Sequence, residues 1–346
     1  MGLTARMWIR CLLFVLCAVS ALGATHKDGK LELRGKVNYG AARFRFLRVT
    51  LFSIESNFTS ATVTDPGGEF HFRDLNPGSY SLAIARRGLG EIRRSVVITP
   101  GLADQKGVVH IDIPFSPAEA ALSRTAGLVS KQQLAVPEKA HGKYAEAERR
   151  LTKHDTEGAI RFLREALAIA PRYMAAWNYL GVLAYQRRDF AEAREYFQKA
   201  LDIEPTAYEP TVNMGGVLLG LRQPQEALAY SLKAAEARPR EALAQSQTGI
   251  AYFELGQWEP AEQYLTTARS LDPAHVTQPQ LYLAEIYVRR GDRAAAAREL
   301  QDLLARRPDG PMAGDLRRSI RRLQNPPPNR RGAVAAPAAS EAQPQP

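Results

Sequence analysis

The residues able to do acid–base or metal chemistry are few in this sequence and widely spaced. The histidines are His26, His71, His110, His141, His154 and His275. They are scattered without the spacing of metal ligands, and no Gly-rich phosphate loop, G-x-S-x-G elbow or H-E-x-x-H motif occurs. We therefore predict that the protein is not an enzyme, needs no cofactor and holds no metal.

One arrangement comes closest to a metal-binding pair. His110 and Asp112 lie two residues apart, so on a strand they would share a face that two metal ligands could use. No third ligand is visible, and a solvated polar face explains the pair more simply. His71 alternates with apolar neighbours and is expected on a solvated face as well. A cross-link between Lys36 and Asp112 would need a buried acid between them, which the sequence does not mark.

Length and charge narrow the class of protein. The chain has 346 residues, which is enough for two or three domains. Its formal net charge is +10, from 46 basic and 36 acidic residues, and the surplus is spread over the whole chain. No Lys/Arg block with interleaved aromatic residues occurs, so we do not expect nucleic acid as a partner.

Residues 1–23 read as an export signal. Arg6 and Arg10 precede a twelve-residue apolar run, 11–22, and Ala21-Leu22-Gly23 is a small-x-small cleavage site. The run is shorter than the roughly 20 residues of a membrane-spanning helix, although retention as an anchor stays an alternative. After cleavage no other segment is expected to span a membrane.

Both cysteines, Cys11 and Cys17, fall inside this leader. A mature chain would then contain no disulfide and no thiolate site. An exported protein without disulfides fits a bacterial envelope better than a eukaryotic secretory route. We expect a periplasmic, cell-envelope or secreted protein.

Residues 27–115 show a period of two. Seven short apolar-alternating runs are separated by Gly, Pro, Asn and Asp at intervals of roughly eight to twelve residues. Such strands bury one another best as two stacked antiparallel sheets, which predicts an all-β sandwich.

Within this region the run from Thr64 to Leu82 reads T-D-x-x-G-x-F-x-F-x-x-L-x-P-G-x-Y-x-L. Asp65, Pro66 and the glycines after them predict a tight turn in which positive φ is needed. The run resembles the carboxypeptidase regulatory-like domain, a small transthyretin-like sandwich. The resemblance implies a binding or spacing module without catalytic residues.

Residues 137–310 contain a repeat, after an Ala/Ser-rich linker at 116–136. Prolines recur at intervals of 34, 34, 34 and 35 residues, and small residues recur 12 and 5 residues before most of them. The prolines are Pro171, Pro205, Pro239, Pro273 and Pro308. Two short antiparallel helices pack closely only where facing positions are small, so this pattern predicts helix pairs.

The unit from Met174 to Ala207 is the clearest copy. Numbered from Met174, its signature residues are Trp177 at 4, Leu180 at 7, Gly181 at 8, Ala193 at 20, Phe197 at 24, Ala200 at 27 and Pro205 at 32. The unit resembles the tetratricopeptide repeat, which implies five stacked helix pairs. At position 15, the turn between the helices, the middle units carry Arg188 and Arg222 where later units carry Gly256 and Gly291.

Residues 311–324 predict one capping helix, with Leu316, Ile320 and Leu323 on one side and four arginines on the other. The arginine row is expected to be solvated, with an anionic surface as the alternative. Residues 325–346, rich in Pro and Ala, are expected to be disordered.

The resemblance implies that the first helix of each pair lines a concave groove. The residues expected to line it, or to stand beside it, mix aromatic, aliphatic and amide groups, which suits a protein or peptide partner. They are Tyr144, Asn178, Val182, Tyr185, Gln186, Asn213, Ile250, Phe253, Tyr282 and Arg289. Each could equally pack between neighbouring helices.

We therefore expect an exported, non-enzymatic scaffold that holds a protein partner in its repeats. The carboxylate clamp of chaperone-binding repeats is not expected, since only Asn178 and Arg289 echo it. The alternative is a glycan- or surface-binding protein that acts through its sandwich and uses the repeats for assembly. Oligomerisation stays open.

Overall fold

The structure is a computed structural model that describes residues 30–39, 46–53, 58–86, 90–117, 120, 136–153 and 155–325. The predicted export signal and most of the predicted linker lie outside these residues. The predicted tail lies outside them from residue 326 onward.

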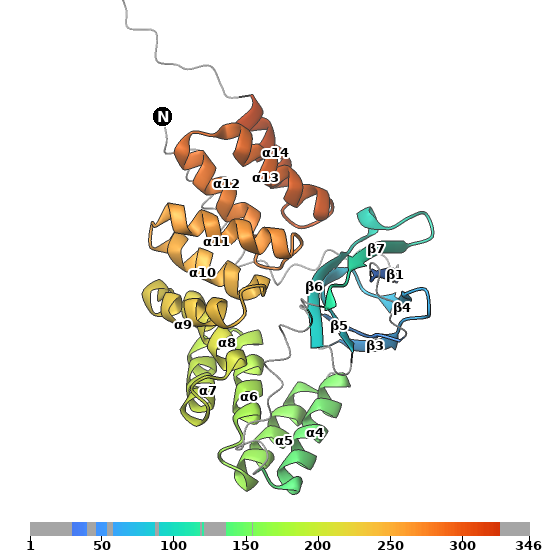
Figure 1. The fold of residues 1–346 in the computed structure, drawn as a ribbon, viewed down its shortest axis with the longest axis vertical. Coiled ribbons are helices and arrows are strands. Elements are labelled where there is room, and N and C mark those ends of the chain that lie inside the picture. Colours follow the sequence, from blue (N-terminus) through green and yellow to red (C-terminus); the bar gives the residue numbers. More distant parts are fainter. Residues whose placement is uncertain are drawn as a thin grey trace, which may run out of the picture.

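The N-terminal part is a sandwich of two sheets (Figure 1). In the described residues one sheet has three strands in the order β4-β1-β7, and the other has four in the order β3-β2-β5-β6. The strands are β1 (Leu31–Asn38), β2 (Arg48–Ser53), β3 (Thr59–Val63), β4 (Glu69–Leu75), β5 (Gly78–Arg86), β6 (Gly90–Ile98) and β7 (Val108–Pro114). The predicted all-β class of this part is confirmed.

One detail of the prediction is wrong. We expected two antiparallel sheets, but β1 and β7 pair in parallel, from Glu32 opposite Val108 to Asn38 opposite Pro114. A parallel pair requires a long connection between its strands. Here that connection is the rest of the sandwich, because β1 and β7 are its first and last described strands.

The sandwich core lies between the sheets and comes from the period-two pattern. Leu33, Leu51, Leu82, Ile84 and Ile98 are fully buried there. Burying such side chains is worth about 1.5–3 kcal/mol each, so this layer holds the two sheets together.

The turn before β4 has the predicted chemistry. Asp65 Oδ1 accepts hydrogen bonds from the backbone N–H groups of Gly67 and Glu69, at 2.8 and 2.7 Å. Gly68 has φ of 83°, which a residue with a Cβ rarely adopts.

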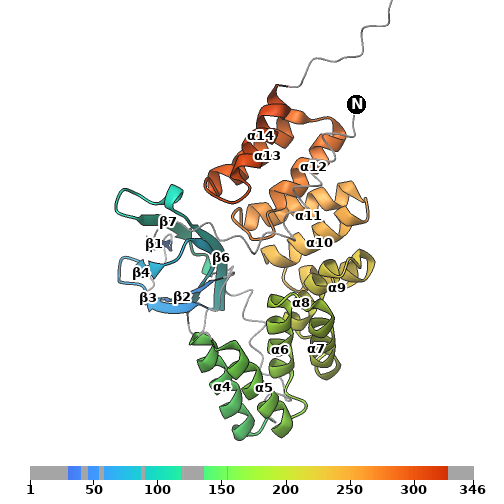
Figure 2. The same cartoon turned by 180° about the vertical axis from the view of Figure 1, so that it is seen from behind.

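The C-terminal part consists of helices in antiparallel pairs (Figures 1 and 2). The pairs in the described residues are α4 (Glu138–Thr152) with α5 (Thr156–Ile169), α6 (Met174–Gln186) with α7 (Phe190–Ile203), α8 (Tyr208–Gly220) with α9 (Pro224–Ala237), α10 (Ala242–Glu254) with α11 (Trp258–Leu271), and α12 (Pro279–Arg290) with α13 (Arg293–Arg306). A last helix, α14 (Ala313–Gln324), packs Leu316 and Ile320 into the core of the final pair. The predicted helical solenoid is confirmed.

Small residues stand where the helices touch. The alanines at repeat position 20 are all fully buried, namely Ala159, Ala193, Ala227, Ala261 and Ala296. Gly181 on α6 faces the buried ring of Phe197 on α7, and a methyl group on Gly181 would come within 2.5 Å of that ring. The helices therefore approach as closely as their backbones allow.

The turns inside the four pairs from α6 to α13 share a positive φ despite different residues. Arg188 and Arg222 have φ of 63° and 59°, and Gly256 and Gly291 have φ of 75° and 86°. The left-handed region costs a residue with a Cβ roughly 1–2 kcal/mol relative to the right-handed one. The two arginines therefore hold this turn under local strain that the glycines avoid.

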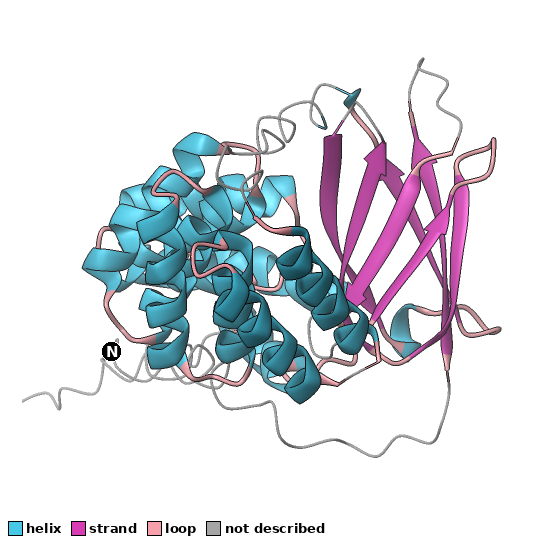
Figure 3. Ribbon diagram, turned by 90° about the horizontal axis from the view of Figure 1, so that it is seen from below, coloured by secondary structure: helices cyan, strands magenta, loops and turns pink. Residues whose placement is uncertain are grey.

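The sandwich lies against one edge of the helical array, formed by the loops that join each pair to the next (Figure 3). The Ser95 N–H of β6 donates to Asp272 Oδ2 at 2.9 Å, and Arg307 Nη1 donates to Ser79 Oγ of β5 at 2.8 Å. A methyl group on Gly101 would collide with Asp309. Contact of this kind places the two parts side by side.

The buried part of the sandwich face turned to this edge is made of small residues. Ser79, Ala83 and Val97 are only 6%, 3% and 7% exposed, although they alternate with the sandwich core and belong to its outer side. Short side chains let the loops come close to the backbone of β5 and β6. We refer to this contact as the edge contact.

Replacing Gly181 with Ala tests the close helix approach. The new methyl group would press on the buried Phe197 ring, so we expect a loss of about 1–3 kcal/mol in the free energy of unfolding, measured by urea denaturation. Gly142→Ala is the matched control, because this exposed position in α4 has no atom within 4 Å of an added methyl group. It should gain about 0.5–1 kcal/mol from helix propensity. Equal effects at both positions would contradict the packing argument.

Candidate functional site

The first helices of neighbouring pairs lie against one another, α6 with α8, α8 with α10, and α10 with α12. They are the helices on which most of the predicted binding residues lie. We refer to their side chains at the predicted positions as the first-helix face.

The structure divides the predicted residues by exposure. Tyr185 is 42% exposed, and Gln186 beside it is exposed as well. Tyr144, Asn178, Val182, Asn213, Tyr282 and Arg289 are half-buried. Ile250 and Phe253 are buried, at 9% and 8% exposure. The accessible part of the first-helix face therefore centres on α6.

Two amides join α6 to α8 on this face. Asn213 Nδ2 donates to Asn178 Oδ1 at 3.1 Å, and both side chains are half-buried. A side-chain amide has two N–H donors and two acceptor lone pairs, so this bond uses only part of the capacity of each residue. The pair can therefore also meet the N–H and C=O groups of a bound backbone.

Next to them Gly216 of α8 is buried beneath side chains of the neighbouring first helices. A methyl group on Gly216 would lie 2.8 Å from Gln247 Nε2 and 3.8 Å from the Tyr185 hydroxyl. Gln247 reaches over from α10 and is buried, and among the described residues its Oε1 has no hydrogen-bond partner. Burying an unpaired amide oxygen costs free energy.

Phe253 belongs to the packing between repeats. Its ring lies 5.3 Å from that of Trp258 and 5.1 Å from that of Tyr282, nearly perpendicular in both cases. The Arg289 guanidinium lies 4.5 Å from the Trp258 ring, and its Nη2 lies 2.7 Å from Glu285 Oε1. Three of the predicted binding residues, Phe253, Tyr282 and Arg289, therefore hold the last two pairs together.

The first pair carries an aromatic cluster. The Tyr144 ring lies 5.3 Å from that of Tyr173 and 6.0 Å from that of Tyr179. Burial raises the pKa of all three hydroxyls, with Glu148 adding to the effect. They stay neutral at physiological pH and keep their donor hydrogens. Tyr173 and Tyr179 were not among the predicted residues, because they lie outside the repeat positions assigned to the groove.

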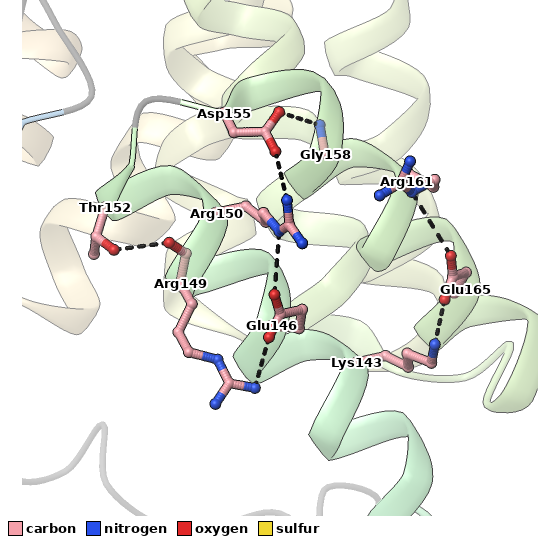
Figure 4. A network of polar contacts seen from close by, with 9 residues as sticks. All are labelled: Lys143, Glu146, Arg149, Arg150, Thr152, Asp155, Gly158, Arg161 and Glu165. Carbon is pink, nitrogen blue, oxygen red and sulfur yellow. Dashed lines mark hydrogen bonds and ion pairs between the residues drawn. The ribbon is translucent and has the colours of Figure 1, made fainter.

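A charged network joins α4 to α5 on the first pair (Figure 4). Arg150 lies between Glu146 and Asp155, at 3.1 and 3.2 Å, and Lys143 Nζ lies 2.5 Å from Glu165. The backbone N–H of Gly158, and then Arg150, hold the pKa of Asp155 below its usual range. Arg161 reaches the same Glu165 from α5, at 3.9 Å.

This network of ion pairs joins the two helices of the first pair, α4 and α5. Its groups are largely exposed, and ion pairs at the surface contribute about 0–1 kcal/mol each. A shallow hollow of about 410 Å³ on α5 is lined by Glu157, Ile160, Arg161, Arg164, Glu165 and Ala168. The hollow is open to solvent, which does not distinguish it as a ligand site.

The residues weighed for metal or cross-link chemistry lie on the sandwich surface. Lys36 and Asp112 are opposite one another in the β1–β7 pair, and both are exposed. His71 is exposed, and His110 Nε2 lies 3.2 Å from Asp104 Oδ2. Across the residues that the structure describes, no three His, Cys, Asp or Glu side chains gather as they would around a metal ion.

Among the helices that the structure describes, none combines the length and the apolar character that crossing a membrane requires.

Comparison with known families identifies the helix pairs. Tetratricopeptide repeat models match residues 174–207, 213–275 and 280–310, which cover α6 to α13. These segments are tetratricopeptide repeats. No such match covers residues 64–82, so their resemblance to the carboxypeptidase regulatory-like domain stays a prediction.

Three curated relatives each match a third or less of this chain. Human cell division cycle protein 16 homolog is 33% identical over 122 residues, which is 33% of this chain and 20% of that protein. Anaphase-promoting complex subunit 6 of Arabidopsis thaliana is 35% identical over 82 residues, which is 22% of this chain and 15% of that protein. A UDP-N-acetylglucosamine–peptide N-acetylglucosaminyltransferase of Giardia intestinalis is 33% identical over 98 residues, which is 28% of this chain and 7% of that protein. The matches therefore span a fifth or less of each relative.

Solved structures similar to the array are tetratricopeptide repeat or pilus proteins. MamA of Desulfovibrio magneticus has a TM-score of 0.46 at 24% identity, covering 51% of this chain and 99% of its own. PilW, a type IV pilus biogenesis factor, has a TM-score of 0.46 at 25% identity, and the match covers 54% of this chain and 87% of PilW. YrrB, described as a TPR protein with an unusual peptide-binding site, has a TM-score of 0.45 at 22% identity, and the match covers 55% of this chain and 99% of YrrB.

Tyr185 and Phe253 occupy the same repeat position but should differ in their effect on stability. Phe253→Ala removes a ring that fills space between Trp258 and Tyr282, so we expect a loss of about 3–5 kcal/mol in the free energy of unfolding. Tyr185→Ala removes an exposed ring and should cost only about 0.5 kcal/mol. Urea denaturation of both variants measures the difference. Similar losses would show that Tyr185 is a packing residue as well.

Proposed function

We propose that this tetratricopeptide repeat protein is an exported, non-enzymatic adaptor that binds a protein or peptide partner on its first-helix face. The repeats supply an extended surface, and the sandwich supports it. This proposal adds export and the choice of face to the general role of such repeats in protein interaction.

The observation that carries it is the surroundings of Tyr185. Its large ring is 42% exposed and lies 5.4 Å from that of Phe190. Exposed aromatic residues on a rigid element often anchor partners, because they bury much apolar area at little entropic cost. Beside it lie the half-buried Asn178–Asn213 amides, and its hydroxyl lies near the buried Gly216 of α8. An apolar anchor beside amides fits a polypeptide, which offers side chains and backbone groups together.

The composition of this face around Tyr185 also indicates how a partner would bind. Tyr185, Gln186, Asn178, Asn213 and Gly216 carry no charge. A complex formed there would depend on apolar contact and hydrogen bonds, so its affinity should vary little with salt concentration.

What favours the repeats over the sandwich as the binding part is the edge contact. The outer side of β5 and β6 is covered by the array, since Ala83 and Val97 are buried there. A partner that acted through the sandwich would have to use its other surfaces, which expose polar residues such as His71 and the apolar side chains of Phe46 and Val63.

Export rests on the sequence of the leader. Arg6 and Arg10 before an apolar run, followed by Ala21-Leu22-Gly23, support secretion with cleavage near Gly23. Mass spectrometry of the protein recovered from a bacterial periplasm tests this directly, and an intact N-terminus would support the anchor alternative.

A double substitution on the first-helix face tests the binding site. Tyr185→Ala with Gln186→Ala should reduce capture of the partner at least about tenfold, because the anchor and an adjacent amide are lost. Capture is measured by quantitative mass spectrometry after pull-down from envelope extract, and then as the dissociation constant of the enriched protein.

Two controls accompany this test. Ile169→Ala removes an apolar side chain of similar exposure, 40%, from a second helix, α5, and should leave capture unchanged. Arg73→Ala alters an exposed residue of the sandwich. Unchanged capture by the double variant, with loss of capture by Arg73→Ala, would favour the sandwich as the binding part.

A further inference from the structure

Two charged side chains in loops between repeats make hydrogen bonds across the edge contact, and Arg93 of β6 also interacts electrostatically with Glu241 before α10. Asp272 follows α11, is 5% exposed, and accepts the Ser95 N–H of β6. Arg307 follows α13 and donates to Ser79 Oγ of β5 at 2.8 Å and to the Ala274 carbonyl oxygen at 3.3 Å. The hydrogen bonds to Ser95 and Ser79 cross from the repeats to the sandwich. The hydrogen bond from Arg307 to Ala274 stays within the repeats and joins the loops after α11 and α13.

His275 lies in the same loop, buried at 8% exposure. Its Nδ1 accepts the Thr277 N–H at 3.3 Å and lies 2.7 Å from Thr277 Oγ1. Thr277 Oγ1 in turn lies 2.5 Å from Ser246 Oγ on α10. The ring therefore acts as an acceptor that fixes the path of the loop from α11 to α12.

An acceptor role requires a neutral ring with its hydrogen on Nε2. Adding a proton to Nδ1 would turn it into a donor facing the Thr277 N–H, and the hydrogen bond that shapes the loop would be lost. The new positive charge would also repel Arg307 and attract the Asp272 carboxylate away from Ser95. One protonation thus acts on both hydrogen bonds of the edge contact.

We propose that His275 makes the edge contact acid-sensitive, so that the sandwich separates from the repeat edge when the ring is protonated. The proposal concerns how the two parts are joined, and it does not depend on which partner the first-helix face binds.

The charges around the ring agree with this direction. Burial lowers the pKa of His275 below its ordinary value of 6.5, Asp272 opposes that shift, and Arg307 adds to it. Among the described residues, Asp272 at the end of α11 and Arg307 at the end of α13 are the charged groups that act on the ring. Ser246 on α10, Ser79 on β5 and Ser95 on β6 carry no charge.

The sign of the effect follows from proton binding. In the docked form the ring binds its proton less readily than it does in water, so docking is fully stable above about pH 6.5. Stability is lost as the pH falls below that value, because the released form takes up the proton that the docked form resists. An envelope protein meets such a change whenever its surroundings acidify.

One backbone amide reports the edge contact. The Ser95 N–H, on the outer edge of β6, donates to Asp272 and not to β5, so its protection from hydrogen exchange depends on docking. We expect this protection in the full chain, measured by NMR and corrected for the intrinsic rate, to fall about tenfold or more between about pH 7.5 and about pH 5.5. The amide of Leu82, inside β5 between β2 and β6, should stay protected.

His275→Asn is the deciding variant, because its side-chain oxygen keeps an acceptor near the position of Nδ1 and does not titrate. It should keep Ser95 protected at both pH values. His71→Asn, which changes an exposed histidine of β4, should behave like the unmodified protein. Asp272→Ala should leave Ser95 unprotected at both pH values and sets the baseline.

The proposal is wrong if the unmodified chain keeps Ser95 protected at about pH 5.5, or if His275→Asn loses protection as the unmodified chain does. Should His275→Asn fail to fold, the unmodified chain still decides the matter. The pH at which Ser95 loses half its protection must match the midpoint of the His275 ring titration, and separate midpoints would overturn the proposal.

Discussion

Everything in this molecule rests on how closely two short helices can approach. Gly181 leaves room for the Phe197 ring, and the buried alanines at repeat position 20 carry only a methyl group, so the facing helices can pack closely at these positions. That closeness gives each pair its geometry, and stacking of equal pairs gives the array its regular edge. Because the loops between pairs then fall at even intervals, a flat sheet can lie along them.

The sandwich packs against this edge in the same way, through small side chains. Its outer side carries Ser79, Ala83 and Val97, which are short enough for loops to reach the backbone of β6. Close approach also brings Asp272 and Arg307 out of water, and buried charged groups need partners. The amide of Ser95 and the hydroxyl of Ser79 supply them. Small side chains thus serve both within the array and between the two parts.

The sequence was sufficient to predict the helix pairs, their boundaries at the prolines and the strands of the sandwich, because each depends on local spacing. It was not sufficient where residues far away in the sequence determine the burial of a side chain or the pairing of two segments. Tyr185 and Phe253 share repeat position 12, yet one is 42% exposed and the other 8%. The difference comes from the next repeat, which places Tyr282 against Phe253 but the smaller Asn213 at the equivalent position after Tyr185. The parallel pairing of β1 with β7 and the edge contact likewise join segments that no local pattern connects.

The edge contact has a consequence for biosynthesis. Ser95 and Asp272 are 177 residues apart, and Ser79 and Arg307 are 228 apart. The sandwich emerges from the ribosome long before its docking surface exists, so the edge of β6 stays uncovered until translation is nearly complete. During that interval β6 is an unpaired strand edge, which is the kind of surface on which other chains assemble. A chaperone that shields this strand until the last repeats arrive would raise the yield of folded protein.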